Sequence, residues 1–349
     1  MAVTVTYNTL NAFTDKFYVR KLKDNFYLSS PLLAKLKARE VKTEGGDDIR
    51  IPLNYASSST AKRWGGRADT FDTVLPEHAT LAVFPWCYYD TTITIPKTDM
   101  LKNMGRSKIV DLLDAETQNA EDSLNDKVGI DLFLTGATSE DAGGKAGVLG
   151  LTAALTYNAN PTSGAYGGIT RVSSSGAKNN PTGNAFWNAN SVAANANTSV
   201  VFWKGSSAWD NSTVLTLAKM QEMFGLCTAG NIKPNLILTS QVLFNKFWSL
   251  LTAIQRQMTD DEMGKIGFQS LSFNGCSVVV DDNINAATSM YFLNMDTFDW
   301  RVHPGMNFEA TPFNEPINQR VAIKGIFLMC QLVCTRPNRN GVITGLTAA

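Results

Sequence analysis

One amphipathic strand near the start of the chain limits what this sequence can fold into. In the run DDIRIPLNY, which begins at Asp47, the apolar residues Ile49, Ile51 and Leu53 alternate with polar or charged ones. A period of two is typical of a strand that buries one face. The strand therefore needs a second layer on which its apolar side can pack.

The segments that follow this strand predict a long hairpin. A polar stretch, from about residue 56 to residue 73, contains one tryptophan and a pair of glycines, which suits a tip. In the return run EHATLAVFPWCYYDTTITIPKTDM, Thr92 and Thr94 alternate with Ile93 and Ile95 and indicate the second strand. Because a two-stranded hairpin is only marginally stable in water, we expect another part of the fold or a neighbouring molecule to cover its apolar face.

Composition narrows the class of protein. The chain has 349 residues, of which 44% are hydrophobic and 18% charged, so global disorder is excluded and one elaborate or two modest domains can form. The 31 basic residues balance the 31 acidic ones, whereas dedicated nucleic-acid binders usually have a basic excess. The five cysteines form no CxxC pair, and the sequence shows neither a signal peptide nor an apolar run of about 20 residues. We expect a soluble protein made in a reducing cytoplasm.

Two further elements are predicted before residue 136. Residues 1–45 contain aromatic clusters without a clean period, which indicates an arm that packs on another surface, or a helix that docks on its own domain. Between Ser107 and Thr135, apolar residues keep helical spacing while acidic residues fill the other face. A continuous helix over this segment would be about 40 Å long and could act as a spine, with Gly136 as its stop.

The rest of the chain predicts an α+β fold with mixed sheets. Residues 136–212 are rich in Gly, Ala, Asn, Ser and Thr, with apolar anchors at YGGITR and NAFWNAN. The second half shows a helix near LTLAKMQEMFGL and another, QVLFNKFWSLLTAIQR, that Ser240 would cap. The predicted strands are NLILT, LSFNGCSVVVDD, MYFLNM and QRVAIKGIFLMCQLVCTRP.

Few residues are candidates for chemistry. The two histidines, His78 and His303, have no Cys or His at ligand spacing. The run AGGKAG lacks the first glycine and the final Ser or Thr of a phosphate-binding loop. Asp281 and Asp282 end a strand, where two carboxylates could hold a divalent ion, although a turn after the strand is the simpler explanation of the same residues. We therefore predict no catalytic residue, no metal site and no cofactor.

Five motifs follow one another along the chain: YGGITRVSSSGAKNNPTGNAFWNAN, NIKPNLILTSQVLFNKFWSLL, GFQSLSFNGCSVVVDDNINAATSMYFLN, HPGMNFEATPF and LVCTRPNRNGVITGL. Each motif alone is modest in specificity. Their order and spacing resemble the major capsid proteins of tailed bacteriophages, and the likeness covers nearly the whole chain.

This resemblance implies the tailed-phage major capsid fold, with five parts. An N-terminal arm would take residues 1–45 and an extended β-hairpin loop residues 46–98. A long spine helix and the first part of a peripheral domain would take residues 99–212, an axial domain residues 213–315, and the C-terminal strands of the peripheral domain residues 316–349. In this family the hairpin lies across the neighbouring subunit, which would cover the amphipathic strand.

The resemblance also implies a function and partners. Copies of the chain would self-assemble, through hexamers and pentamers, into an icosahedral head shell that encloses phage double-stranded DNA without sequence-specific binding. A separate scaffolding protein and a portal would take part, and a decoration protein is a further candidate partner. The shell would form in the host bacterial cytoplasm and become the virion, without a membrane. Two alternatives stay open: an encapsulin-like compartment that holds a cargo enzyme, and a metal enzyme that uses Asp281 and Asp282.

Six residues are candidates for the subunit interface. Tryptophan and arginine are frequent anchors of interfaces, and obligate contacts commonly bury more than about 2,000 Å². The candidates are Lys62, Arg63, Trp64 and Arg67 at the hairpin tip, with Phe13 and Phe17 in the arm. The alternative interpretation is a mobile tip in which the tryptophan is incidental.

Overall fold

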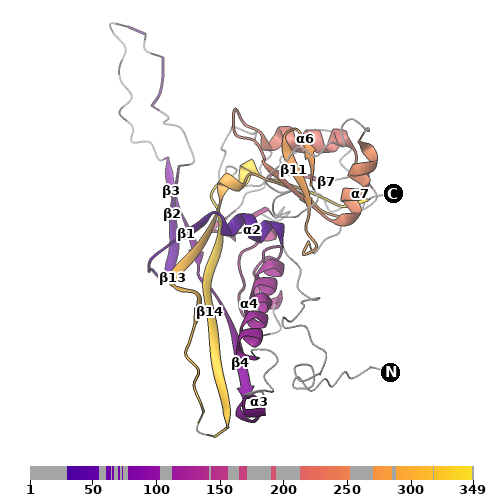
Figure 1. Ribbon diagram of the computed structural model, residues 1–349. Helices are drawn as coiled ribbons and strands as arrows, with labels where there is room; N and C mark the ends of the chain where they lie inside the picture. Colours follow the sequence, from indigo (N-terminus) through magenta and orange to yellow (C-terminus); the bar gives the residue numbers. More distant parts are fainter. Residues whose placement is uncertain are drawn as a thin grey trace.

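The computed structural model describes residues 30–54, 60–63, 65–66, 70, 73, 78–102, 112–140, 143–155, 165–170, 190–193, 213–251, 270–284, 288–316 and 318–347. Two mixed sheets organise these residues, one of four strands and one of six, in different parts of an elongated molecule (Figure 1). The predicted α+β architecture with mixed sheets is confirmed.

The four-stranded sheet has the order β1-β13-β14-β4. Its long central pair is β13 (Phe298–Ala310) and β14 (Val321–Cys334), which are antiparallel. The short strand β1 (Glu40–Lys42) runs parallel to β13, and β4 (Cys87–Pro96) runs antiparallel to β14 along its whole length. Burial alternates along β4, so that one face of this strand is packed and the other is exposed.

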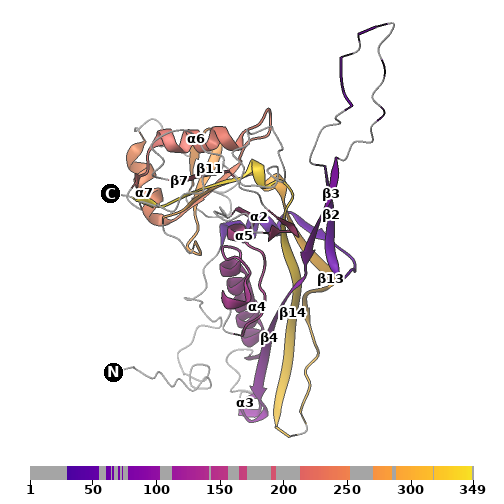
Figure 2. The ribbon, with the colours of Figure 1, turned by 180° about the vertical axis from the view of Figure 1, so that it is seen from behind.

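Helix α4 (Leu112–Asp131) covers the packed face of β4, as both ribbon views show (Figures 1 and 2). Its apolar stripe of Ala120, Leu124 and Val128 is buried, as the helical spacing predicts. The predicted helix ran from residue 107 to residue 135, whereas α4 ends at Asp131. Residues 103–111 lie outside the described part, so the predicted start is not tested. The chain turns after Asp131, and Gly136 adopts a φ of +74° where a Cβ would lie 2.6 Å from the carbonyl oxygen of Val148.

The six-stranded sheet collects strands from distant parts of the sequence. Its order is β10 (Ser270–Phe273), β11 (Cys276–Val280), β9 (Leu236–Thr239), β12 (Met290–Leu293), β15 (Gly341–Thr344) and β7 (Asn190–Ala193). Helices α6 (Leu217–Cys227) and α7 (Gln241–Leu250) pack on it. Helix α7 begins after Ser240, as predicted, although the Ser240 side chain makes no capping hydrogen bond.

Sheet membership does not follow the contiguous boundaries expected at residues 213 and 315. Strand β13 lies between these boundaries, yet it belongs to the four-stranded sheet, whereas β7 and β15 lie outside them and belong to the six-stranded sheet. The alternation of apolar and polar residues in a strand shows which of its faces is buried, but it does not show which other strand pairs with it. For this reason the sequence could not place these three strands.

Short elements complete the described fold. The part of the expected arm that the structure describes contains α2 (Pro31–Lys37), whose leucines are buried in the main core, so this part matches the alternative of a helix docked on its own domain. The remaining elements are α3 (Lys97–Lys102), α5 (Leu151–Leu155), the pair β5 (Ala165–Tyr166) and β6 (Ile169–Thr170), the pair β8 (Thr213–Val214) and β16 (Leu346–Thr347), and the 3-10 helices η2 (Thr138–Glu140), η4 (Met295–Thr297) and η5 (Pro337–Arg339).

The predicted hairpin exists, but it pairs different strands from those expected. Strand β2 (Asp48–Asn54) pairs antiparallel with β3 (Ala79–Pro85). The alternation at residues 92–95 lies in β4, which pairs with β14 and not with β2. The prediction that residues 92–95 form the second strand of the hairpin is therefore wrong, because a half-buried strand of the body has the same period as a hairpin strand.

The base of this hairpin is fixed to its own body by the turn between β5 and β6. The ring of Phe84 lies edge-on to Tyr166, with centroids 5.0 Å apart, and the Val83 amide donates a hydrogen bond to the carbonyl oxygen of Gly167 at 2.9 Å. The Tyr166 hydroxyl accepts a hydrogen bond from the Cys334 amide at 2.9 Å. Gly167 has a φ of +59°, and a Cβ on it would lie 2.7 Å from Cζ of Phe84.

We expect Gly167→Ala to destabilise the subunit more than Gly168→Ala does. Both glycines have positive φ, which costs an alanine about 1 kcal/mol, but a Cβ at Gly168 meets open space whereas one at Gly167 collides with Phe84. Denaturant unfolding of the two variants measures the difference in free energy. Equal losses would show that the contact with Phe84 does not constrain this turn.

Candidate assembly interface

The hairpin is directed away from the body by Trp86, the residue that separates β3 from β4. Its side chain is 6% exposed, its indole N–H donates to the carbonyl oxygen of Gly46 at 3.1 Å, and its ring lies edge-on to His303. These contacts fix the junction at which the chain passes from β3 of the projecting hairpin into β4 of the body (Figures 1 and 2). No pattern in the sequence distinguishes Trp86 from the strand residues on either side of it.

The subunit itself covers the base of the hairpin completely and the part beyond the base only in part. Ile49 and Phe84 are buried at the base. Further out, Leu81 is 46% exposed on one face, and Ile51 and Leu53 are only partly buried on the other. Strand β2, the amphipathic strand with which the sequence analysis begins, therefore keeps part of its apolar surface in contact with solvent in the single chain.

The structure describes two of the six predicted interface residues. Lys62 and Arg63 are exposed beyond β2 and β3, and the Lys62 ammonium donates a hydrogen bond to the carbonyl oxygen of Thr70. The other four lie outside the described residues: Trp64, Arg67, Phe13 and Phe17. Their role at an interface stays a prediction.

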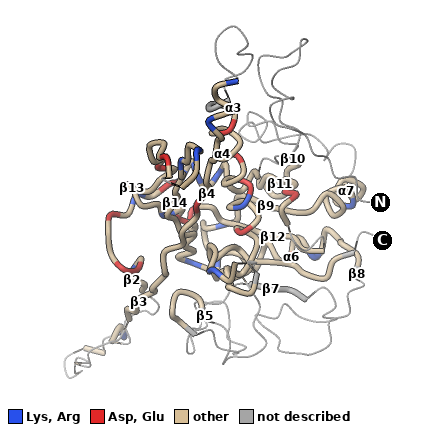
Figure 3. Tube along the Cα trace, turned by 90° about the horizontal axis from the view of Figure 1, so that it is seen from below, with Lys and Arg blue, Asp and Glu red and all other residues tan. Residues whose placement is uncertain are grey.

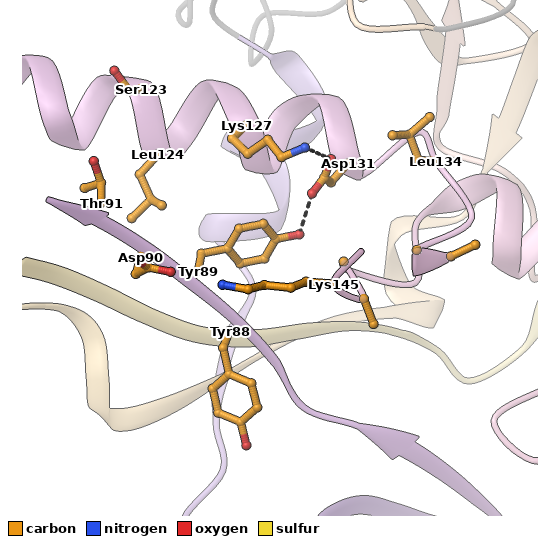
Figure 4. Close-up of a pocket in the computed structure, with 14 residues that line it drawn as sticks. Tyr88, Tyr89, Asp90, Thr91, Ser123, Leu124, Lys127, Asp131, Leu134 and Lys145 are labelled. Carbon is orange, nitrogen blue, oxygen red and sulfur yellow. Dashed lines mark hydrogen bonds and ion pairs between the residues drawn. The ribbon is translucent and has the colours of Figure 1, made fainter. Parts of the chain in front are cut away.

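A cavity of about 250 Å³ lies between α4 and β4 (Figure 4). Within it, the buried carboxylate of Asp131 accepts a hydrogen bond from the Tyr89 hydroxyl at 2.8 Å and forms an ion pair with Lys127 at 3.1 Å. The Tyr89 hydroxyl in turn accepts a hydrogen bond from the Val148 amide at 3.0 Å. Burial raises the pKa of Tyr89, so its hydroxyl stays protonated and can donate. These polar groups join the helix, the strand and the loop after α4.

A second buried side chain, Gln331, fixes the same loop to β14. Its carbonyl oxygen accepts hydrogen bonds from the amides of Leu149 and Leu332 at 2.9 and 3.0 Å, and its NH₂ group donates to the carbonyl oxygen of Pro85 at 2.8 Å. The neighbouring Cys87 thiol is not an activated nucleophile, because burial raises its pKa to about 11. All five cysteines are buried and free.

Asp281 and Asp282 do not form a pair of carboxylates. Asp281 is 2% exposed and accepts hydrogen bonds from the Ser30 hydroxyl at 2.8 Å and the Asn283 amide at 3.1 Å. Asp282 is exposed. Burial raises the pKa of Asp281, although these hydrogen bonds oppose the shift. Since Ser30 is the N-cap of α2, this aspartate anchors the N-terminal helix to the end of β11.

The described residues contain no cluster of side chains suited to a metal ion. Among them, no three His, Cys, Asp or Glu side chains gather as metal ligands would. His78 is exposed, and His303 packs on Trp86 and accepts a hydrogen bond from the Gly305 amide at 3.1 Å. Basic and acidic residues are interspersed along the described chain (Figure 3). No helix in this part of the chain combines the length and the apolar character needed to cross a membrane.

We expect Asp281→Ala to lower the free energy of unfolding by about 2 kcal/mol, because it leaves the buried Ser30 hydroxyl and the partly buried Asn283 amide without their acceptor. The matched control is Asp282→Ala, which removes an exposed carboxylate and should change stability by less than about 0.5 kcal/mol. Urea unfolding followed by tryptophan fluorescence measures both. Equal effects would contradict the anchoring role of Asp281.

Comparison with known proteins gives structural matches only. Neither a family sequence model nor a curated protein sequence matches the chain. A chain in the capsid asymmetric unit of cyanophage A-1(L) has 20% identity and a TM-score of 0.68, with 98% of this chain and 99% of that one covered. The capsid of the native GTA particle has 10% identity and a TM-score of 0.60, with 99% of both chains covered.

A third match is the SrpI encapsulin complex of Synechococcus elongatus PCC 7942, with 9% identity, a TM-score of 0.54, and 95% of this chain and 94% of that one covered. These likenesses span nearly the full length of each chain. At such low identity they establish the fold. The chain therefore has the fold shared by the capsid proteins of tailed phages and by encapsulins, as its motifs predict.

Proposed function

We propose that this chain is a major capsid protein, which assembles through hexamers and pentamers into an icosahedral shell around phage double-stranded DNA. The observation that carries the proposal is the hairpin, which projects from a capsid fold with an incompletely covered distal half. A single copy leaves this apolar surface in water. Assembly with other copies would bury it.

A ring of subunits supplies such a cover. When the same heterologous contact is repeated around a closed ring, the projecting element of each subunit packs on the next one. Obligate contacts of this kind commonly bury more than about 2,000 Å².

The charge of the chain suits a container for DNA. Its 31 basic and 31 acidic residues leave no net charge, so the shell would enclose the DNA without binding it tightly or reading its sequence. A separate scaffolding protein and a portal are the proposed partners during assembly in the bacterial cytoplasm, and a decoration protein is a further candidate. The finished shell would be part of the virion.

An encapsulin-like compartment is the second candidate, because an encapsulin shares the fold over nearly the full chain. The phage capsid match has the higher identity and the higher TM-score, 20% and 0.68 against 9% and 0.54, which favours the phage shell. The two functions differ in what the shell contains.

The test is to express the chain with and without its genomic neighbours, and to analyse the products by electron microscopy and by their contents. The proposal predicts capsomers or shells, and particles from infected cells should contain nuclease-protected DNA. Shells filled with one folded enzyme would favour the encapsulin alternative. A small oligomer or monomer under all conditions would contradict both.

We expect Leu81→Ser to reduce particle yield severalfold while the subunit remains folded, since Leu81 is an exposed apolar residue of the hairpin. Leu81→Met is the matched control, because it keeps an apolar side chain of similar volume and should assemble normally. Particle yield by sedimentation and subunit stability by thermal unfolding separate assembly from folding. Normal assembly of Leu81→Ser would exclude this surface from the interface.

A further inference from the structure

We propose that Gln331 is the positioning residue of the hairpin: its buried amide holds the corner at Trp86, where the chain passes from β3 into β4, and so sets the direction in which the hairpin leaves the body. The inference rests on the proposed function in one respect, that copies of the chain assemble. It adds a consequence for assembly. The rotation between neighbouring subunits decides how a repeated contact closes, so the direction of a projecting element affects the curvature of the shell.

Strand β14 continues past the end of its pairing with β4. The last pair of this ladder is Cys330 with Cys87, and the chain leaves the sheet at the next residue toward the hairpin, Trp86. From there to Cys334, β14 pairs only with β13 among the described strands. The edge of β14 that faces β4 therefore has no described strand beside it at this end.

Two amides of β14 point to this edge. The Thr335 amide donates to the carbonyl oxygen of Thr297, which directly precedes β13. Because hydrogen-bonded pairs alternate along an antiparallel ladder, odd-numbered residues at this end of β14 face β13 and even-numbered residues face the other edge. Leu332 and Cys334 are even-numbered and buried. A buried amide without an acceptor is costly, so both need a replacement for β4.

Two side chains supply these acceptors, and both also contact the root of the hairpin. Oε1 of Gln331 accepts a hydrogen bond from the Leu332 amide at 3.0 Å. The Tyr166 hydroxyl accepts one from the Cys334 amide at 2.9 Å, and the Tyr166 ring lies edge-on to Phe84 of β3. The root of the hairpin is therefore held at the end of β14, where the strand itself is missing.

Gln331 acts on the corner itself. Its NH₂ group donates to the carbonyl oxygen of Pro85, the last residue of β3, at 2.8 Å. The same group donates to Sγ of Cys87, the first residue of β4, at 3.3 Å. The side chain therefore spans both sides of Trp86, and it is fully buried. Because a buried polar group whose partners are all in place is rigid, both strands that meet at the corner are fixed relative to β14.

The hydrogen bond of Trp86 has a different role at the corner. Its indole N–H donates to the carbonyl oxygen of Gly46, which lies between β1 and β2. This bond joins the two roots of the hairpin to each other. The contact of the Trp86 ring with His303 of β13 is an edge-on ring contact without a hydrogen bond between the two side chains. Among the described contacts, Gln331 is thus the hydrogen-bonded connection from the corner to β14.

The test separates direction from stability with two matched variants, Gln331→Glu and Asn340→Asp. Both amides are fully buried, and each substitution keeps the accepting oxygen but replaces the NH₂ donor by a second oxygen. In Gln331→Glu the lost partners lie at the corner. In Asn340→Asp they lie outside the hairpin, at Thr297, Arg336 and Cys334. We expect similar losses of stability from both variants in thermal unfolding.

The first measurement is the direction of the hairpin in the unassembled chain. Spin labels are attached at Ala79→Cys in β3 and Glu121→Cys on α4, which are exposed, whereas the five native cysteines are buried. We expect a narrow distance distribution for the parent and for Asn340→Asp, and one several times broader for Gln331→Glu. A narrow distribution for folded Gln331→Glu, or a broad one for the parent, would overturn the inference. If Gln331→Glu does not fold, Gln331→Met removes the same donor without a charge and is judged in the same way.

The second measurement links this direction to the shell. The same variants, without labels, are expressed under the conditions in which the parent assembles, and particle diameters are measured by electron microscopy. We expect uniform particles from Asn340→Asp, as from the parent, and mixed diameters or open sheets from Gln331→Glu. Uniform particles of the parental diameter from Gln331→Glu, or mixed diameters from both variants, would overturn the inference and leave the proposed function intact. If the parent forms no particles, the proposed function itself fails, whereas the distance measurement still decides the role of Gln331 at the corner.

Discussion

The structure depends on one constraint, the fixed direction of a hairpin that cannot cover its own apolar surface. Trp86 holds the point where β3 becomes β4, and Gly167 with Phe84 and Tyr166 holds the base. The distal half extends beyond these anchors, where Leu81 remains exposed. The base is therefore held firmly while the distal half keeps exposed apolar surface, which the proposed shell would cover.

The body of the subunit supplies the rigidity that such a projection needs. The buried Asp281 links the end of β11 to the N-cap of α2, and Gln331 and Asp131 tie the loop after α4 to the four-stranded sheet. These side chains are polar and buried, and their hydrogen bonds are satisfied within the body. Asp281, a candidate metal ligand in the sequence, thus fixes the geometry of the subunit instead.

The spacing of apolar residues predicted which faces of the helices and strands are buried. The buried stripe of α4, the start of α7 after Ser240 and the amphipathic character of β2 follow from spacing alone. The pairing of β4 with β14 could not be predicted in this way, because strands more than two hundred residues apart leave no local signal of their pairing. The sequence predicted the interface at the tip, whereas the exposed large apolar residue in the described part of the hairpin is Leu81.

The most direct test of the central claim is a cryo-electron microscopy reconstruction of assembled particles that resolves individual strands, which lie about 4.8 Å apart. The account predicts that density for β2 and β3 leaves one subunit and lies against the neighbouring one. Density for the same strands folded back over their own subunit, with no contact to a neighbour, would contradict it.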